Sequence, residues 1–297
     1  MTDTIAPPDM ALPDDDLVPV ERGRNLKRFL RNRPALIGAT LMLVLLFCAI
    51  FAPLMYPYPE DVADAVHFDR MLQPPSWDYW MGTDETGRDV LTRVLAGAKL
   101  SLAMGGIVIA MAVVIGVPVG LVAGYYGGKI EAVLMRITDV FSSIPALVLA
   151  LAISVVLGSS FANAILALGL VWWRVFARLA HGQTLSLKSE NYVTAARQMG
   201  ASDLRIMFRE ILPNMASPLL VAASLDAGAV ILIGTSISFL GAGASPPTAE
   251  WGLMVAGGRH YLPGAWWPSL FPGLAIFVTV MSLNLIGDGL RDLFAGD

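Results

Sequence analysis

Runs of about 20 consecutive apolar residues recur along this sequence, and they constrain its fold more than any other feature. In an α-helix, a run of this length crosses the roughly 30 Å hydrocarbon layer of a bilayer. Of the 297 residues, 56% are hydrophobic and only 15% are charged. Soluble domains carry roughly 25% charged residues, so this composition indicates a membrane protein.

Six such runs predict six membrane-spanning helices. The expected spans are about 34–54, 100–124, 133–157, 161–180, 216–241 and 269–287. The runs are continuously apolar rather than alternating, which favours helices over a β-barrel, because a helix satisfies its backbone hydrogen bonds within its own segment. We therefore expect an all-α, polytopic membrane protein in which residues 34–297 form one transmembrane domain. Pro118, Pro145 and Pro272 fall within these runs, where each is expected to kink its helix.

The placement of lysine and arginine predicts the topology. Residues 1–33 form a tail whose first 20 or so residues are rich in proline and aspartate and are expected to be disordered. Basic residues gather directly before the first run and again after the fourth, and the positive-inside rule places both groups in the cytoplasm. Both termini are therefore expected in the cytoplasm, with the acidic region 56–99 and the loop 243–268 on the outside. Trp251, Tyr261, Trp266 and Trp267 in that loop are typical of an interfacial aromatic belt.

The loop 191–214, between the fourth and fifth runs, is predicted to hold two short amphipathic helices. In the first, Tyr192, Ala195, Ala196 and Met199 fall at i, i+3, i+4 and i+7 and share one helical face. Gly200 is suited to the left-handed conformation that ends a helix, and Ser202 or Asp203 to the cap of the next.

In the second helix the same spacing recurs. Leu204, Met207, Phe208 and Ile211 form the apolar face, and Pro213 is expected to end the unit. A helix pair that is too polar to span a membrane and apolar on one face must pack against something. The candidates are the protein's own helix ends, the lipid surface or a partner protein.

The motif in this loop resembles a known family. Thr194-Ala195-Ala196, Gly200 and Ile211-Leu212-Pro213 are similar to the cytoplasmic coupling loop of integral-membrane subunits of binding-protein-dependent ABC importers. The family's usual first residue is Glu, where this chain has Thr194, so no ionic role is assigned there. The resemblance implies that the loop docks onto a separate ATPase.

Further segments are similar to the C-type permease of dipeptide and oligopeptide importers. They are Met81 to Asp89, Ser238 to Gly241, Pro246 to Gly252 and Asn284 to Asp292, together with the basic segment before the first run. The resemblance implies a permease in the cell inner membrane for di- or oligopeptides. It also implies a second homologous permease, two ATP-binding subunits and an extracytoplasmic solute-binding protein, with no nucleic acid. Permeases for nickel complexes, opines and some sugars are closely similar, so the solute stays open.

The segment around residues 82–89 is predicted to be structural. Gly82 and Gly87 are suited to turns, while Asp84 or Asp89 can pair with Arg88 and cap a helix that starts near Val90. Thr83 completes the Gly-Thr-Asp part of the motif. Two carboxylates at this spacing could instead bind Ca²⁺, but the usual alternation of oxygen ligands is absent.

Asp226 is an acidic residue near the middle of the fifth run. An intramembrane carboxylate costs a few kcal/mol to insert, so it usually faces a cavity or a partner. We therefore consider that it lines a translocation pathway, or that it bonds a neighbouring helix. An ion-coupled secondary transporter that uses Asp226 is the competing class, but such a protein does not need the 191–214 loop.

No nucleotide-binding loop of the type Gly-x4-Gly-Lys-Ser/Thr occurs in the sequence, so ATP and Mg²⁺ are expected in partner ATPase subunits and no cofactor in this chain. The chain is not expected to be an enzyme, because no catalytic arrangement can be placed at one depth. His67, His181, His260 and the single Cys48 show no metal-ligand spacing.

Overall fold

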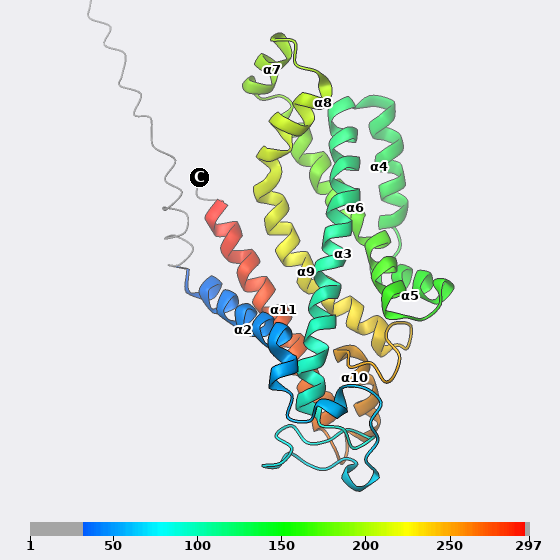
Figure 1. Cartoon of the computed structure of the whole chain (residues 1–297). Helices are drawn as coiled ribbons and strands as arrows, with labels where there is room; N and C mark the ends of the chain where they lie inside the picture. Colours follow the sequence, from blue (N-terminus) through cyan, green and yellow to red (C-terminus); the bar gives the residue numbers. More distant parts are fainter. Residues whose placement is uncertain (1–31, 295–297) are drawn as a thin grey trace, which may run out of the picture.

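The computed structural model describes residues 32–294, and within them the protein is all-α, as predicted (Figure 1). The only strand-like feature in this range is an isolated bridge between Thr83 and Asp89. The predicted tail, residues 1–33, lies almost wholly outside the described residues. The long helices are α2 Arg33–Met55, α3 Val90–Tyr126, α4 Gly128–Ser142, α5 Ala146–Leu157, α6 Phe161–Leu187, α9 Ala216–Phe239 and α11 Trp267–Phe294, and the shorter α10 spans Trp251–Gly258.

Short elements connect the long helices at the two ends of the molecule. They are η1 Pro59–Val62, η2 Phe68–Arg70, α7 Asn191–Gln198, α8 Asp203–Arg205, η3 Ile206–Ile211, η4 Pro213–Met215 and η5 Arg259–Tyr261. Five helices in residues 32–294 are long and apolar enough to cross a membrane, and the number reaches six if α4 and α5 together form one span. The chain is therefore a polytopic helical membrane protein.

The predicted span 133–157 is not one straight helix. α4 and α5 meet at an angle of 87°, with Pro145 in an extended conformation between them. Pro118 and Pro272, in contrast, lie inside the continuous helices α3 and α11. The difference has a local cause, because Ser142 and Ser143 precede the break and their hydroxyls donate to the Thr138 and Val140 carbonyls, each at 2.8 Å. These bonds offer the backbone an alternative to the helical ladder.

The core of the transmembrane domain lies between α3 and α6. Gly120 of α3 packs so closely on α6 that a Cβ atom there would clash with the Ala177 carbonyl oxygen. Small residues allow such close approach, which gives helix pairs in membranes their van der Waals contact. Val108 and Ala112 of α3 and Phe176 of α6 are fully buried and belong to one hydrophobic cluster.

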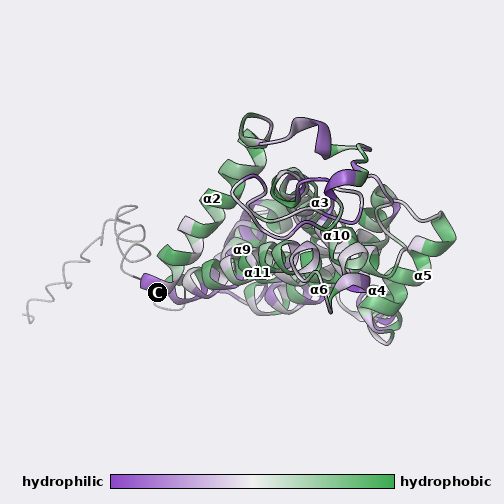
Figure 2. Ribbon diagram, turned by 90° about the horizontal axis from the view of Figure 1, so that it is seen from below, coloured by the Kyte–Doolittle hydropathy of each residue, from purple (hydrophilic) through white to green (hydrophobic). Residues whose placement is uncertain are grey.

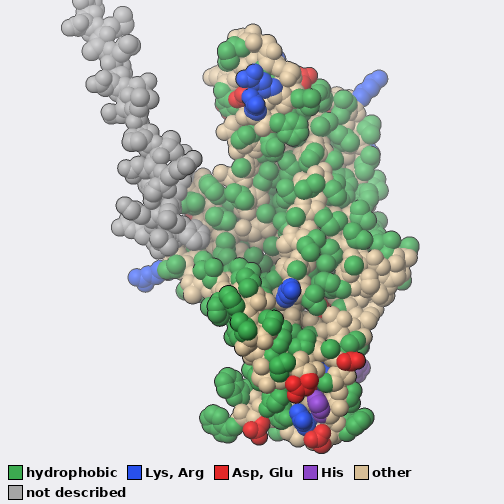
Figure 3. All heavy atoms as spheres, in the orientation of Figure 1, with side chains coloured by type: hydrophobic (Ala, Val, Ile, Leu, Met, Phe, Trp, Pro, Cys, Tyr) green, Lys and Arg blue, Asp and Glu red, His purple; other side chains and the backbone are tan. Residues whose placement is uncertain are grey.

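The molecule is elongated, with polar ends and an apolar middle. Figure 1 shows α7 and α8 at one end, and α10 with the connection from α2 to α3 at the other. On the face seen in Figure 3, apolar side chains cover the middle, and most charged ones lie toward the two ends. Figure 2, seen along the long axis, shows hydrophobic residues running along the long helices. This distribution is that of a protein whose apolar middle spans a bilayer and whose two polar ends contact water.

Candidate functional site

The 191–214 loop contains two helical segments at the places that its sequence predicts. α7 ends before Gly200, whose φ of +81° is the left-handed conformation that glycine adopts without strain. The Ser202 hydroxyl then accepts the Arg205 backbone N–H at 3.4 Å and caps α8. The turn and the cap expected from the sequence are therefore both present.

The face of α7 predicted to be apolar is divided between the interior and the surface. Ala196 is buried, together with Val193, which the predicted face did not include. Tyr192 and Ala195 are exposed, and Met199 is 82% exposed. One side of α7 thus packs on the protein's own helix ends, while the other presents apolar side chains outward.

The second predicted helix needs a correction. Residues Ile206–Ile211 form a π-helix, and the N–H of the following Leu212 donates to the Met207 carbonyl at 2.9 Å, five residues back. Because a π-helical turn contains more residues than an α-helical turn, the α-helical period of about 3.6 residues does not describe which side chains are buried. Met207 and Ile211 are buried along with Ile206. Leu204 and Phe208, which were assigned to the same face, are 63% and 52% exposed.

Pro213 does not end the unit, contrary to the prediction. The helical path continues through η4 into α9, so that Asp203–Phe239 runs as one membrane-length helix. Proline lacks a backbone N–H, and the helix tolerates it here because it opens the η4 turn, where that N–H is not needed. The Asn214 side chain also donates to the Glu210 carbonyl at 2.6 Å and satisfies that acceptor.

A tyrosine at the end of α3 anchors the loop. The Tyr125 hydroxyl donates to the Asp203 carboxylate at 2.7 Å, and the Arg197 guanidinium lies 5.7 Å from the Tyr125 ring centroid. Lys188 adds a third contact by donating to the Gly124 carbonyl at 2.8 Å. Contacts between distant segments leave no periodic signal, so the sequence does not indicate that Tyr125 anchors the loop. The loop is thereby tied to α3 as well as to α6 and α9.

At the opposite end, residues 56–89, here called the 56–89 segment, fold around buried charges. Gly82 and Gly87 have φ values of +71° and +80°, as turns at these positions require. The buried Asp84 carboxylate accepts from the Arg88 Nε at 2.8 Å and lies 3.4 Å from the Arg93 Nε. Asp84 also accepts the backbone N–H groups of Thr86 and Arg88 at 2.9 and 3.0 Å.

Asp89 caps α3, and a fully buried aspartate supports it. The Asp89 carboxylate accepts the Thr92 N–H at 2.7 Å, and burial raises the pKa of Asp89 although these hydrogen bonds oppose the shift. Asp61 accepts the Asp89 N–H at 2.8 Å and pairs with the His67 ring at 2.8 Å. From the sequence, Asp61 is only one residue of an acidic region. Its role in supporting Asp89 depends on contacts between segments that the sequence does not reveal.

The predicted aromatic belt is only partly correct. Trp251 and Trp267 are buried, and their indole N–H groups donate to the Val94 and Thr83 carbonyls at 2.9 and 3.0 Å. These two residues therefore fasten residues 240–266, here called the 240–266 segment, and α11 to α3 and the 56–89 segment. Tyr261 and Trp266 are more exposed, as a belt residue should be.

Glu250 is a fully buried carboxylate that the sequence analysis did not single out. It caps α10 by accepting the Gly252 and Leu253 N–H groups at 3.0 and 2.9 Å. Burial raises the pKa of Glu250, and the two backbone hydrogen bonds oppose that shift. The group is placed to hold the start of α10 against α3 and α9.

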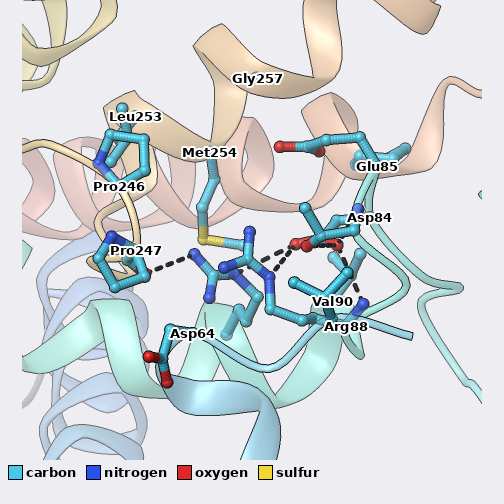
Figure 4. A pocket seen from close by; sticks show the side chains of 14 residues that line it. Asp64, Asp84, Glu85, Arg88, Val90, Pro246, Pro247, Leu253, Met254 and Gly257 are labelled. Carbon is cyan, nitrogen blue, oxygen red and sulfur yellow. Dashed lines mark hydrogen bonds and ion pairs between the residues drawn. The ribbon is translucent and has the colours of Figure 1, made fainter. Parts of the chain in front are cut away.

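A cavity of about 500 Å³ lies between the 56–89 and 240–266 segments. Figure 4 shows Asp84, Glu85 and Arg88 on one side of it and Pro246 and Pro247 on the other. Arg93 bridges the two segments by donating to the Pro247 carbonyl at 3.1 Å. The two segments therefore form one unit around shared charges. Asp226 lies far from this cavity in sequence, on α9, and is partly buried.

Comparison with known proteins gives two family matches. Residues 116–296 match the family described as binding-protein-dependent transport system inner membrane component. Residues 23–75 match the N-terminal TM domain of oligopeptide transport permease C. The first match covers more than half of the chain.

Similar curated proteins extend over most of the chain. It is 39% identical over 286 residues to the dipeptide transport system permease protein of Alkalihalophilus pseudofirmus, covering 96% of this chain and 93% of that protein. It is 40% identical over 270 residues to the di/tripeptide transport system permease protein of Pseudomonas aeruginosa, covering 89% of this chain and 88% of that protein. It is 42% identical over 266 residues to the glutathione transport system permease protein of Escherichia coli O6:K15:H31, covering 90% of this chain and 87% of that protein.

Solved structures show the same fold. An inward-facing conformation of the MetNI methionine ABC transporter superposes with a TM-score of 0.57 at 22% identity, covering 70% of this chain and 97% of that chain. A second crystal form of that transporter gives a TM-score of 0.56. With the membrane-length helices and the exposed loop already described, these findings show that the chain belongs to the inner-membrane components of binding-protein-dependent transport systems, as a multi-pass permease subunit.

Proposed function

We propose that this permease subunit carries di- or oligopeptides across the cell inner membrane, driven by two ATP-binding subunits that dock on the 191–214 loop. The substrate class is supported by the similar curated proteins, which are named as permeases for a dipeptide, a di/tripeptide and glutathione. The basic residues near the loop support a cytoplasmic position for the loop and for both termini. ATP and Mg²⁺ belong to the partner subunits.

The observation that carries the docking proposal is the exposed apolar surface of the loop. Tyr192, Met199, Leu204 and Phe208 stand on two successive short helices and are all more than one third exposed. Ala195, small and also exposed, permits close approach of a partner. Apolar groups that stay exposed at a polar end of the molecule mark a protein interaction site.

The remaining residues of the loop transmit movement rather than contact the ATPase. Ala196, Met207 and Ile211 point into the core, Gly200 sets the turn, and Pro213 leads the second helix into α9. When a bound partner moves, the whole 191–214 loop therefore moves with it, together with the ends of α3, α6 and α9 on which the loop packs. Rigid-body motion of this kind is a common basis for switching between two states, here an inward-open and an outward-open path.

At the other end, the 56–89 and 240–266 segments are proposed to receive solute from an extracytoplasmic binding protein. Gly82, Thr83, Asp84, Gly87, Arg88 and Asp89 act as its scaffold through the hydrogen bonds around Asp84 and Asp89. A second, homologous permease completes the path, with Asp226 of α9 proposed to face it. A carboxylate at this depth attracts cationic groups such as the ammonium end of a peptide.

Docking is tested by purifying the tagged chain from its native membranes and labelling the co-purified subunits with a photoreactive ATP analogue. We expect labelled ATP-binding chains with the wild type, and their loss with Met199→Asp combined with Phe208→Asp. Leu262→Asp, an exposed apolar residue in the 240–266 segment, is the matched control and should retain them. Retention by the loop variant would exclude this docking surface. Uptake of labelled dipeptide by cells tests the substrate class independently.

A further inference from the structure

A groove between α2 and α3 has the features of a lipid site. It encloses about 530 Å³ near the ends of these helices that lead to the 56–89 segment. Leu46, Ile50, Pro53 and Leu102 line most of it, and the polar groups are Tyr56 and Lys99. The helices approach each other through small residues, since Ala49 and Ala98 are both buried in one cluster with Trp251. The groove is thus apolar along most of its length and polar at one end.

The polar end lies at the boundary of the apolar zone. Lys99 stands immediately before the apolar run 100–124, and Tyr56 follows the last residue of α2. The nearby turn 76–79 is held beside this boundary, because the Tyr58 hydroxyl donates to the Asp78 carbonyl at 3.0 Å. Trp77 in that turn is 95% exposed, as expected of an aromatic residue at the membrane–water interface. Tyr56 and Lys99 are therefore at headgroup depth.

Lys99 is exposed, and its ammonium has no carboxylate partner in the described part of the chain. Within residues 32–294, no aspartate or glutamate lies within 4.0 Å of the Lys99 ammonium, and the ammonium donates no hydrogen bond to another residue of this range. Lysines at the edge of the hydrocarbon place their stems along apolar surface and their ammonium groups among the headgroups. A phosphate at this depth satisfies the charge, and the groove below it has the apolar lining that an acyl chain requires.

We propose that this groove binds an anionic phospholipid. The phosphate lies against the Lys99 ammonium and the Tyr56 hydroxyl, and one acyl chain follows Ile50, Leu46 and Leu102. The site does not depend on the proposed peptide transport, because it requires only that the chain spans a membrane. It also does not depend on which leaflet this end of the molecule faces.

The test uses the purified complex in phosphatidylcholine nanodiscs that contain a minor share of phosphatidylglycerol with a photoreactive acyl chain. Labelled peptides are mapped by mass spectrometry. We expect labelling of residues 46–56 and 99–103, and about fivefold less of it with Lys99→Gln, the factor that corresponds to about 1 kcal/mol for one cation at a membrane surface. Lys99→Arg should keep the labelling. Lys129→Gln, at the other end of the molecule, is the matched control and should not change it.

A second variant tests the acyl position without touching the charge. Ala103→Trp fills the groove and should remove labelling of residues 46–56 while the complex assembles normally, as checked by its elution volume and melting temperature. The proposal would be overturned if Lys99→Gln were labelled as strongly as the wild type, or if photoreactive phosphatidylcholine labelled these residues as strongly as photoreactive phosphatidylglycerol. Competition by soluble glycerophosphate would overturn it as well. A cross-link from position 102 to a partner polypeptide would also overturn it, since the groove would then hold protein.

Discussion

The hydroxyl of Tyr125 lies 2.7 Å from the carboxylate of Asp203, and this contact joins α3 to the start of α8. α3 is one continuous helix of 37 residues, which at 1.5 Å per residue is about 55 Å long. Its first residue follows the Asp89 cap in the 56–89 segment, and its last turn holds the 191–214 loop. α3 therefore connects the 191–214 loop directly to the other end of the molecule.

Tyr125→Phe tests whether this contact couples ATP hydrolysis to uptake. The variant keeps the ring that faces Arg197 but removes the hydroxyl that donates to Asp203 and accepts from the Arg197 guanidinium at 3.4 Å. Because these contacts are exposed to solvent, each contributes about 1 kcal/mol or less. We expect ATPase subunits to stay bound while the amount of peptide taken up per ATP hydrolysed falls several-fold in proteoliposomes. Tyr126→Phe is the control, because Tyr126 is half-exposed and its hydroxyl forms no hydrogen bond among residues 32–294. Equal coupling in both variants would contradict the role of Tyr125.

Gly120→Ala tests the close contact of α3 with α6. The added Cβ meets the Ala177 carbonyl oxygen and the Ala180 side chain, and overpacking of this kind costs about 1 to 3 kcal/mol. We expect a melting temperature several degrees lower in detergent and a lower yield of assembled complex. Gly106→Ala in the same helix is the matched control, since nothing lies within 4 Å of its new Cβ. If both variants melted like the wild type, the packing described here would be wrong.

Glu250 predicts a specific pH dependence of stability. Because burial raises its folded pKa above the ordinary value of 4.5, the folded state binds more protons than the unfolded state between these two pKa values. The free energy of unfolding therefore falls as the pH rises through that window and is constant above it. The glutamine of Glu250→Gln does not titrate, so only the wild type loses stability in this window. The melting temperature of the variant, relative to that of the wild type, should therefore rise with pH above 4.5 and then become constant. Thermal melts across this range measure it, and a difference that is independent of pH would contradict the assignment.

Asp226→Asn tests the proposed position of that carboxylate on the translocation path. The substitution preserves shape and removes charge, so we expect normal assembly with reduced uptake of labelled dipeptide. Asp226→Glu keeps the charge and should retain most of the uptake. Unchanged uptake by Asp226→Asn in an assembled complex would show that the residue bonds a neighbouring helix instead.

Local patterns in the sequence predicted the features that depend on neighbouring residues in the chain. Apolar runs predicted the membrane helices, and Gly200 predicted the turn of the 191–214 loop. The sequence offered Asp84 or Asp89 as the cap of α3, and the structure has Asp89 there. The same reasoning grouped Leu204 and Phe208 with Met207 and Ile211 on one apolar face, but only the latter two are buried, because the π-helix changes the spacing there. It also read the run through Pro145 as one helix, since a break at proline depends on whether nearby groups satisfy the backbone.

What the sequence alone determined is the class of protein, its membrane-spanning character and the place of the loop that marks its family. The membrane-spanning character follows from hydrophobic length, which acts within one segment. The class and the family follow from the resemblance of the loop motif and of the other similar segments to known permeases. Only the tertiary structure decided which loop residues are buried, that Tyr125 holds Asp203, and that Asp61 and Arg93 join separate segments. Burial and pairing are properties of two surfaces in contact, and the second surface comes from residues far away in the chain.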